Sequence, residues 1–437
     1  MLSHPEQLDR LATACPEAVP TAVLAGDPCY DRILEALPDR DRFRRALGVG
    51  PGQRLIVLNS TWSPRSLFGD STDDSFDDLL PWLLPRLTGE LPADEYRVAA
   101  VLHPNIWYGH GEGQLRGWLA RARAAGLTPV PPLEGWRQAL IAADCVIGDH
   151  SSVTFYAAAL GTPVLLGAFP AGDLDPDSPV AALGRTAPHL VPGKDLRTQL
   201  DRAVHEHEPK RYAALAAQTS SDPLRSAALL RRLFYRLIGL PEPADRPALL
   251  TRLAVPAYAP AERTAPVRVL TRILGTHPPT VRVTRYCDPP YEPEEADADS
   301  AHTAVAEDTP DPARPALADV IVRTAAEDDP RLGPPRSWAA EVLARHPGCA
   351  LAAYLTAPGR CYIGTREGVA ARLAAAPDPD GRPSTADPAA LASAVYAWLA
   401  AGHPLPAELV VRTGPITHRV AVTPQSPAPA SPPAPAL

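Results

Sequence analysis

The sequence predicts an α/β protein: a Rossmann-like, doubly wound parallel sheet followed by a smaller α+β domain. Two observations support this prediction. Between residues 54 and 168, short apolar runs alternate with stretches of helical period, which is typical of parallel strands connected by helices. The chain also has 437 residues, whereas one domain commonly has about 100–200. We therefore expect two folded units.

Five short apolar segments are the predicted strands of the parallel sheet. They are RLIVLNST, YRVAAVLHP, LTPV, CVIGDH and PVLLGA. Helices are expected between them, near residues 74–88, 111–125, 134–143 and 151–160. Three more helices, 195–206, 209–218 and 222–238, are expected to pack on the sheet and complete a first domain over residues 1–240.

The second half of the chain predicts a linker and a second domain. Residues 241–266 are rich in Pro, Ala and Arg and form the predicted linker, and the second domain covers residues 267–423. Its expected strands are VRVLTRIL, TVRVTRY, DVIVRT, CALAAYLT, RCYIGT, ELVVRT and HRVAV, and its expected helices are 336–346, 366–375 and 388–401.

Two segments of the second half have compositions typical of disorder. Residues 288–318 combine proline with many acids, so we expect a long disordered excursion that interrupts the second domain. The tail 424–437 is rich in proline and is expected to be extended and disordered.

Composition excludes several classes of function. The net charge is −8 and no run dense in Lys or Arg appears, so nucleic acid is not an expected partner. The six cysteines are scattered without a C-x-x-C pair, and neither a metal nor another cofactor is expected. No transmembrane segment or leader is indicated, which predicts a cytoplasmic protein.

The stretch from Asp144 to Ala168 is the most informative for chemistry. A predicted strand ends at Gly148-Asp149-His150, and Ser151-Ser152 begin a predicted helix. Amides, hydroxyls and the positive end of the helix would then meet at the carboxyl edge of the sheet, which suits a diphosphate. Asp149 would instead accept a hydrogen bond from a hydroxyl. The alternative is that the serines only cap the helix, a contribution of about 1 kcal/mol.

Further polar residues are expected at the same edge of the sheet. His103 lies where a predicted strand meets a proline, and it could donate to a donor phosphate or stabilise the leaving group. Ser60 and Thr61 follow the first strand and could bind a phosphate or a sugar hydroxyl, and His150 lies within plausible reach. For His103 the alternative is a hydrogen bond within a loop. For Ser60 and Thr61 it is ordinary capping of the strand end.

The pattern Asp149-His150-Ser151-Ser152, an apolar helix, then Gly161-Thr162-Pro163 and a strand is similar to the donor-binding motif of the CDP-glycerol:poly(glycerophosphate) glycerophosphotransferase family. Three other segments occur in the family's order. Gly26-Asp27-Pro28-Cys29-Tyr30-Asp31 resembles its Gly-x-Pro-x-x-Asp, Asn59-Ser60-Thr61-Trp62 its Pro-Thr-Trp, and Leu102-His103-Pro104 its strand-end His-Pro. The resemblance covers residues 20–240.

This resemblance implies the C-terminal, donor-binding half of a GT-B fold, the two-domain fold of many glycosyltransferases. It implies transfer from a nucleotide-diphospho donor, either CDP-glycerol or a nucleotide sugar, to a hydroxyl of an acceptor polyol or glycan, as in the synthesis of a cell wall polymer. His103 is the implied catalytic residue. The implied donor-binding residues are Ser60, Thr61, Asp149, His150, Ser151 and Ser152.

The family's N-terminal domain has no counterpart in the sequence before Gly26, so we expect the transferase to be incomplete as written. A start codon placed too far downstream, a partner chain that supplies the missing domain, and a chain that kept nucleotide binding for another purpose remain open. The opening residues resemble the middle of a domain, which favours the first. Alone, the chain is expected to bind a nucleotide diphosphate with little or no transfer.

Two other functions remain as alternatives. One is an enzyme resembling UDP-sugar 2-epimerases, and the other is a non-catalytic nucleotide-binding or regulatory protein. A GTPase of the P-loop class is excluded, because Gly193-Lys194 is followed by Asp195 and no G-x-x-x-x-G-K-[ST] motif occurs.

Overall fold

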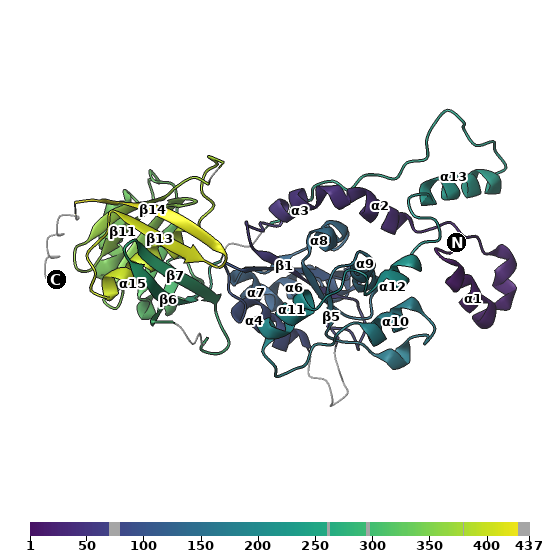
Figure 1. Ribbon diagram of the computed structural model, residues 1–437, viewed down its shortest axis with the longest axis horizontal. Helices are drawn as coiled ribbons and strands as arrows, with labels where there is room; N and C mark the ends of the chain where they lie inside the picture. The colour runs from purple at the N-terminus through teal and green to yellow at the C-terminus, as the bar shows by residue number, and fades with distance from the viewer. Residues whose placement is uncertain (70–78, 260–262, 294–297, 379, 427–437) are drawn as a thin grey trace.

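The computed structural model describes residues 1–69, 79–259, 263–293, 298–378 and 380–426. These residues form two units that lie side by side, an α/β unit that begins at the N-terminus and a β-barrel that follows it (Figure 1). The α/β unit with a second, β-rich unit confirms the predicted fold class in its main features.

The α/β unit is built on a five-stranded parallel sheet with the strand order β3-β2-β1-β4-β5. Every predicted strand of this sheet is confirmed, with bounds that are a little shorter than expected. The strands are β1 (Arg54–Ser60), β2 (Tyr96–Leu102), β3 (Thr128–Pro129), β4 (Cys145–Gly148) and β5 (Val164–Leu166).

Helices cover both faces of the sheet, so its central strand is buried on both sides. Along β1, Leu55 and Val57 belong to one apolar core and Ile56 and Leu58 to the other, because successive side chains of a strand point to opposite faces. Strands buried in this way appear as unbroken apolar runs, which is the signal that predicted a parallel sheet.

Each face of the sheet has its own set of helices. One core includes side chains of α2 (Pro28–Ala36), α3 (Arg40–Ala46), α8 (Trp136–Ala142), α9 (Ser152–Ala159), α10 (Pro179–Thr186) and α12 (Ala213–Ala217). The other core includes side chains of α4 (Leu79–Gly89), α5 (Pro104–His110), α6 (Glu112–Trp118), α7 (Ala120–Ala124) and α11 (Leu196–His205).

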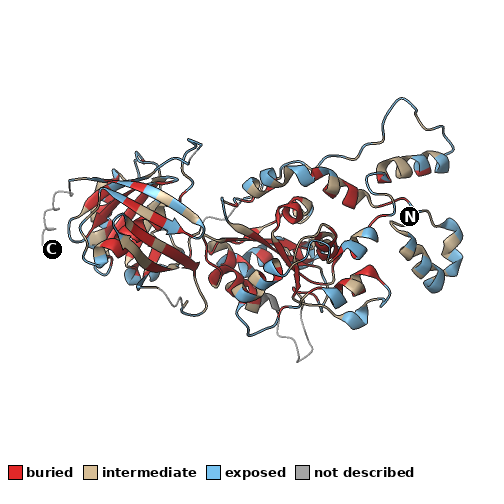
Figure 2. Ribbon diagram, viewed as in Figure 1, coloured by how far each residue is buried: buried red, intermediate tan, exposed pale blue. Residues whose placement is uncertain are grey.

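The remaining helices of this unit lie at its periphery. They are α1 (Pro5–Ala14), η1 (Pro16–Thr21), η2 (Leu37–Asp39), η3 (Ala171–Asp173) and α13 (Ser226–Leu237). The prediction that residues 222–238 pack on the sheet is wrong for α13, which begins at Ser226 and packs on α2. Buried residues concentrate in the sheet and the barrel, whereas α1 and α13 are mostly exposed or half-buried (Figure 2).

The second unit is a closed barrel with the strand order β10-β11-β12-β14-β13-β7-β6-β8-β9. Its strands are β6 (Val267–Thr276), β7 (Pro279–Cys287), β8 (Ser300–Ala306), β9 (Val320–Thr324), β10 (Leu351–Ala357), β11 (Arg360–Thr365), β12 (Ala370–Ala375), β13 (Glu408–Thr413) and β14 (Ile416–Pro424). A short helix, η4 (Arg314–Leu317), precedes β9.

Helix α15 (Pro388–Ala400) fills the interior of the barrel. Its buried residues, among them Leu391, Val395 and Trp398, share one core with inward side chains of strands around the barrel. A helix that is apolar on all sides is typically buried in this manner. Helix α14 (Pro335–Arg345) packs on the outside against β10 and β11.

Two predictions for the second unit are corrected by the structure. Residues 366–375 were expected to be helical, but residues 370–375 form β12, which pairs with β11 and β14 after a turn that contains Gly368 at φ +84°. The alanine-rich composition favours a helix locally, and pairing on both edges overrides it.

The second correction concerns residues 288–318, which were expected to be disordered. Residues 300–306 form β8, which pairs with β6 and β9, and its His302 and Ala304 are buried. Within this segment, residues 294–297 lie outside the described residues, as do residues 427–437 of the tail. Residues 424–426 of the tail are described, and Pro424 is the last residue of β14.

The predicted linker, residues 241–266, contacts the α/β unit at several of its described residues. Gln138 donates to the carbonyl of Ala254 at 2.9 Å, and the Tyr258 hydroxyl donates to the carbonyl of Gly135 at 2.5 Å. These contacts attach the segment to α8 and to the turn before it.

A buried ion pair joins the two units. Arg285 of β7 binds Asp94 of the α/β unit through Nη2 at 2.6 Å and Nε at 2.9 Å, and its Nη2 lies 2.8 Å from Asp387 of the barrel. The amide of Ala93 donates to the carbonyl of Arg285 at 2.8 Å. The turn at Gly52 also approaches Pro415 so closely that a Cβ at position 52 would lie 2.6 Å from it.

Candidate functional site

The carboxyl edge of the parallel sheet brings the predicted residues together through the buried carboxylate of Asp149. Its Oδ2 accepts from the amide of Thr61 at 2.8 Å and from the hydroxyl of Ser60 at 3.2 Å, and its Oδ1 accepts from the amide of Ser151 at 3.2 Å. Burial raises the pKa of Asp149, and the Thr61 amide opposes this shift. The carboxylate therefore ties the loop after β1 to the beginning of α9.

Ser151 is the N-cap of α9. Its hydroxyl oxygen accepts from the amide of Thr154 at 3.2 Å and from the side-chain amide of Asn59 at 2.6 Å. Asn59 also donates to Thr154 Oγ1 at 2.9 Å. For Ser151 the structure favours the alternative of helix capping over direct contact with a ligand, because its hydroxyl is buried and already engaged.

Ser60 has a similar structural setting. Its side chain is buried, and its hydroxyl oxygen accepts from the amide of Phe68 at 2.9 Å. Ser60, Asp149 and Ser151 thus hold the loop after β1 against α9, and none of them presents an exposed side chain. Thr61 is half-buried at the beginning of that loop.

The accessible part of this edge is formed by Ser152, His150 and His103. Ser152 is exposed at the first position of α9, where helical geometry leaves backbone amides without carbonyl partners inside the helix. His150 is half-buried, and its Nδ1 is a buried atom without a hydrogen-bond partner among the described residues.

His103 is the N-cap of α5 and belongs to the same edge. Its backbone amide donates to the carbonyl of Ser60 at 3.0 Å, and its Nδ1 accepts from the amide of Asn105 at 3.1 Å. Partial burial lowers the pKa of His103, with an opposing effect from the Asp149 carboxylate. The neutral ring therefore carries its proton on Nε2. The exposed ring of Trp62 lies beside it, with ring centroids 6.4 Å apart.

The Gly26–Asp31 segment has a structural role. Asp27 caps α2 by accepting from the amides of Cys29 and Tyr30 at 2.8 and 3.0 Å, and it accepts from the Tyr156 hydroxyl of α9 at 2.6 Å. The buried carboxylate of Asp31 accepts from the amides of Leu224 and Ser226 at 2.7 and 2.9 Å. This motif fastens α2 to α9 and to the beginning of α13.

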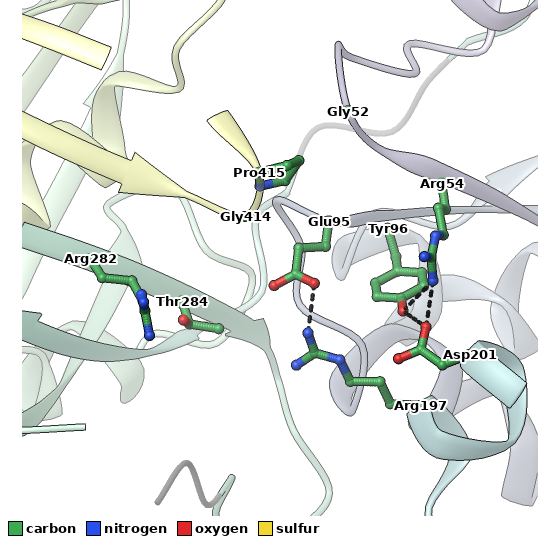
Figure 3. Close-up of a pocket in the computed structure, with 10 residues that line it drawn as sticks. All are labelled: Gly52, Arg54, Glu95, Tyr96, Arg197, Asp201, Arg282, Thr284, Gly414 and Pro415. Carbon is green, nitrogen blue, oxygen red and sulfur yellow. Dashed lines mark hydrogen bonds and ion pairs between the residues drawn. The ribbon is translucent and has the colours of Figure 1, made fainter. Parts of the chain in front are cut away.

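A cavity of about 670 Å³ lies at the opposite, amino-terminal edge of the sheet, between the two units (Figure 3). The sequence alone does not predict this cavity, because its lining comes from segments far apart in the chain. The lining residues are Gly52, Arg54, Glu95, Tyr96, Arg197, Asp201, Arg282, Thr284, Gly414 and Pro415.

Within the described ranges, no group of three or more His, Cys, Asp or Glu side chains is placed to hold a metal ion. In the same part of the chain, no helix is long and apolar enough to cross a membrane.

No protein-family model and no curated protein matches the sequence. Several solved structures are similar to part of it. The H548A form of the wall teichoic acid polymerase TagF has 16% identity and a TM-score of 0.37, over 55% of this chain and 56% of TagF. The structure of TagF without that change has the same identity and TM-score, over 54% of this chain and 56% of TagF.

Two further neighbours are less similar. Anabaena Alr3699/HepE in complex with UDP and glucose has 16% identity and a TM-score of 0.28, over 46% of this chain and 52% of that one. A structure concerning EarP-mediated arginine glycosylation of elongation factor EF-P has 19% identity and a TM-score of 0.27, over 49% and 73%. The chain spans about half the length of the TagF and HepE structures.

Proposed function

We propose that the protein binds the diphosphate of a nucleotide-linked donor at the beginning of α9. The observation that carries this proposal is the beginning of α9, where Ser152 is exposed at the carboxyl edge of a parallel sheet. Ser151 caps the amide of Thr154, whereas the amides of Ser152 and Val153 have no carbonyl partner within the helix and would bind an incoming anion. Ligands of open α/β sheets bind at this edge.

The residues of the edge would divide into two groups. Ser152, His150 and His103 would contact the phosphates, and Thr61 would contact a hydroxyl of the transferred group. Ser60, Asp149 and Ser151 would position them, because their polar atoms bind one another and the loop after β1. The buried Asp149 carboxylate would not touch the phosphates, which avoids repulsion between like charges.

The proposed reaction is transfer of glycerol phosphate or a glycosyl group to the hydroxyl of a polyol or glycan. The acceptor oxygen would form the new bond, the bond to the nucleotide would break, and the acceptor proton would pass to a base. The helix end and the Nε2–H of His103 would stabilise the charge that develops on the leaving nucleotide. The four motifs shared with CDP-glycerol glycerophosphotransferases support CDP-glycerol as the donor.

In a GT-B enzyme, the base and the acceptor site belong to a second Rossmann-like domain. We propose that another domain, on the same polypeptide or on a partner, supplies them here. Without it, the chain would bind the donor and transfer little, because the acceptor would not be held in position.

His103→Asn provides a specific test of this proposal. Asparagine is a good N-cap, so it would preserve the beginning of α5, but it lacks the Nε2–H that would reach a phosphate. Calorimetric titration with CDP, UDP and GDP should show affinity that is about tenfold weaker than in the unaltered protein. The matched control is His205→Asn, which alters an exposed histidine at the end of α11. Equal affinities in the two variants would contradict a phosphate contact by His103.

A further inference from the structure

The last turns of helix α13 are not covered by the rest of the protein. Leu233 and Leu237 lie one turn apart on the same side of the helix, because side chains four residues apart are neighbours on a helix surface. Leu233 is 5% exposed, whereas Leu237 is 71% exposed. The protein therefore covers this side of α13 only as far as Leu233.

Large apolar side chains gather at the uncovered end of α13. Phe234, Leu237 and Ile238 have the i, i+3, i+4 spacing that places them on one face of a helix, and Leu240 follows directly after it. All four are exposed. Single exposed apolar residues are ordinary on a protein surface, but a contiguous group of them marks a place of interaction.

Two arginines lie beside this apolar face. Arg232 and Arg236 are four residues apart and exposed, so they share one side of the helix. Neither forms an ion pair with any of the described residues, whereas Arg231 is paired with Glu242 at 2.7 Å. The α13 patch is defined here as the exposed side chains of Arg232, Phe234, Arg236, Leu237, Ile238 and Leu240.

The surroundings of the α13 patch are basic in a protein that is acidic as a whole. Residues 225–252 contain six arginines and two acidic residues, a local formal charge of four positive, whereas the whole chain has a net charge of −8. A basic segment of this kind is attracted to the negative surface of a membrane that contains anionic lipids. The charge therefore favours an anionic partner for the patch.

The position of α13 suits a membrane surface. The helix lies at the end of the α/β unit remote from the barrel, on the outside of the protein (Figure 1). Amphipathic helices that combine an apolar face with arginines lie in the interface of a bilayer. The apolar stem of an arginine can follow the acyl chains while its guanidinium group stays among the headgroups.

We propose that the α13 patch binds the surface of an anionic membrane. Phe234, Leu237 and Ile238 enter the acyl region, and Arg232 and Arg236 bind the headgroups. This attachment requires no helix that crosses the membrane. The patch shares no residue with the beginning of α9, so the inference does not rest on the proposed donor site.

Co-sedimentation of the full chain with lipid vesicles tests this proposal. One set of vesicles contains phosphatidylglycerol mixed with phosphatidylcholine, and the other contains phosphatidylcholine alone. We expect binding to the mixed vesicles that salt weakens, and much weaker binding to phosphatidylcholine. Leu237→Gln should weaken binding to the mixed vesicles about tenfold, because it removes a buried apolar side chain from the bound state. The double variant Arg232→Gln/Arg236→Gln should weaken it about tenfold or more.

Matched controls make the same substitutions outside the α13 patch. Leu317→Gln alters an exposed leucine of η4, and Arg360→Gln alters an exposed arginine of β11. Both should bind the mixed vesicles like the unaltered protein, as should His103→Asn at the proposed donor site. Melting temperatures without lipid establish that each variant is folded, which we expect because the altered side chains are exposed.

Hydrogen exchange on the unaltered protein gives a readout that needs no substitution. The mixed vesicles should slow exchange across residues 234–240, and the barrel strands should be unaffected. Equal binding to the two kinds of vesicle, or undiminished binding of Leu237→Gln, would overturn the proposal. So would self-association of the chain that Leu237→Gln abolishes, in the absence of vesicle binding, because the patch would then bind a second copy of the protein.

Discussion

The carboxylate of Asp149 accepts a hydrogen bond from the backbone amide of Thr61 at 2.8 Å, and so it joins the end of β1 to the beginning of α9. Thr61 and Asp149 are 88 residues apart in the sequence. The same carboxylate also accepts from Ser60 and Ser151, so one buried side chain sets the shape of the proposed donor site.

Asp149→Asn should therefore destabilise the α/β unit. The asparagine amide group would place N–H donors where the carboxylate now accepts from other donors. We expect the free energy of unfolding to fall by about 2 kcal/mol, the usual effect of losing buried hydrogen bonds to a charged group. Urea denaturation measures this change. The control Asp173→Asn, which alters an exposed ion pair with Arg65, should change stability by less than about 1 kcal/mol; an equal loss in both variants would contradict this account.

Arg285 should be essential to the contact between the units. Its side chain is buried between Asp94 and Asp387, so Arg285→Ala would leave two carboxylates without their shared cation. We expect a loss of about 3 kcal/mol in the free energy of unfolding. Arg268→Ala, which alters a more exposed pair with Glu292, is the matched control on β6 and should cost less than about 1 kcal/mol. Similar losses of stability in Arg285→Ala and Arg268→Ala would contradict the expected effect of burial.

Asp31→Asn should release α13 while the sheet stays folded. The Asp31 carboxylate accepts from the amides of Leu224 and Ser226 at the beginning of that helix. We expect faster hydrogen exchange and faster proteolysis across residues 224–240, with little change in β1 or β4. Glu35→Gln, on the exposed side of α2, serves as the control. Unaltered exchange in α13 would show that Asp31 does not anchor it.

The barrel should lose stability in acid because of His302. This side chain is buried against Tyr396, and neither ring nitrogen has a partner among the residues that the structure describes. Burial lowers the pKa of His302 to about 3, with a smaller effect from Arg268.

The sign of this pH effect follows from the lowered pKa. The unfolded chain takes up a proton near pH ~6.5, whereas the folded barrel does so only near pH 3. The stabilisation is therefore complete above pH ~6.5 and falls by about 1.4 kcal/mol per pH unit toward pH 3. Relative to His302→Phe, the unaltered protein should lose stability between pH 7 and pH 5 in urea denaturation. The control His277→Phe should have the same pH dependence of stability as the unaltered protein. A difference in the free energy of unfolding between the unaltered protein and His302→Phe that stays constant with pH would contradict the prediction.

The parallel sheet was predictable from sequence because its strands are buried on both faces. The run RLIVLNST predicts the bounds of β1 closely, because the side chains of Leu55 to Leu58 belong alternately to the two apolar cores. Barrel strands were harder to predict wherever pairing decides the structure. Residues 370–375 have an alanine-rich composition that favours a helix, and β8 follows directly after a run of acids, so only their partner strands identify them.

The candidate site was predictable in place but not in detail. The sequence predicted that Ser151 and His103 lie at the carboxyl edge of the sheet, and both cap helices that begin there. The sequence could not show that the hydroxyl oxygens of Ser151 and Ser60 already accept hydrogen bonds. Their donors, the Asn59 side chain and the Phe68 amide, are brought to them only by the tertiary structure. The cavity between the two units was equally hidden, because its lining residues, among them Arg54 and Arg282, are far apart in the chain.

The central claim is that backbone amides at the beginning of α9 bind a diphosphate, and Ser152→Pro tests it most directly. Proline is well tolerated at the first position of a helix, and Ser151 already has an extended backbone, so the substitution removes one amide N–H with little disturbance. Ser152→Ala is the matched control that removes only the hydroxyl. In calorimetric titration with CDP, Ser152→Pro should bind about tenfold more weakly than Ser152→Ala. Equal CDP affinity in the two folded variants would contradict the claim.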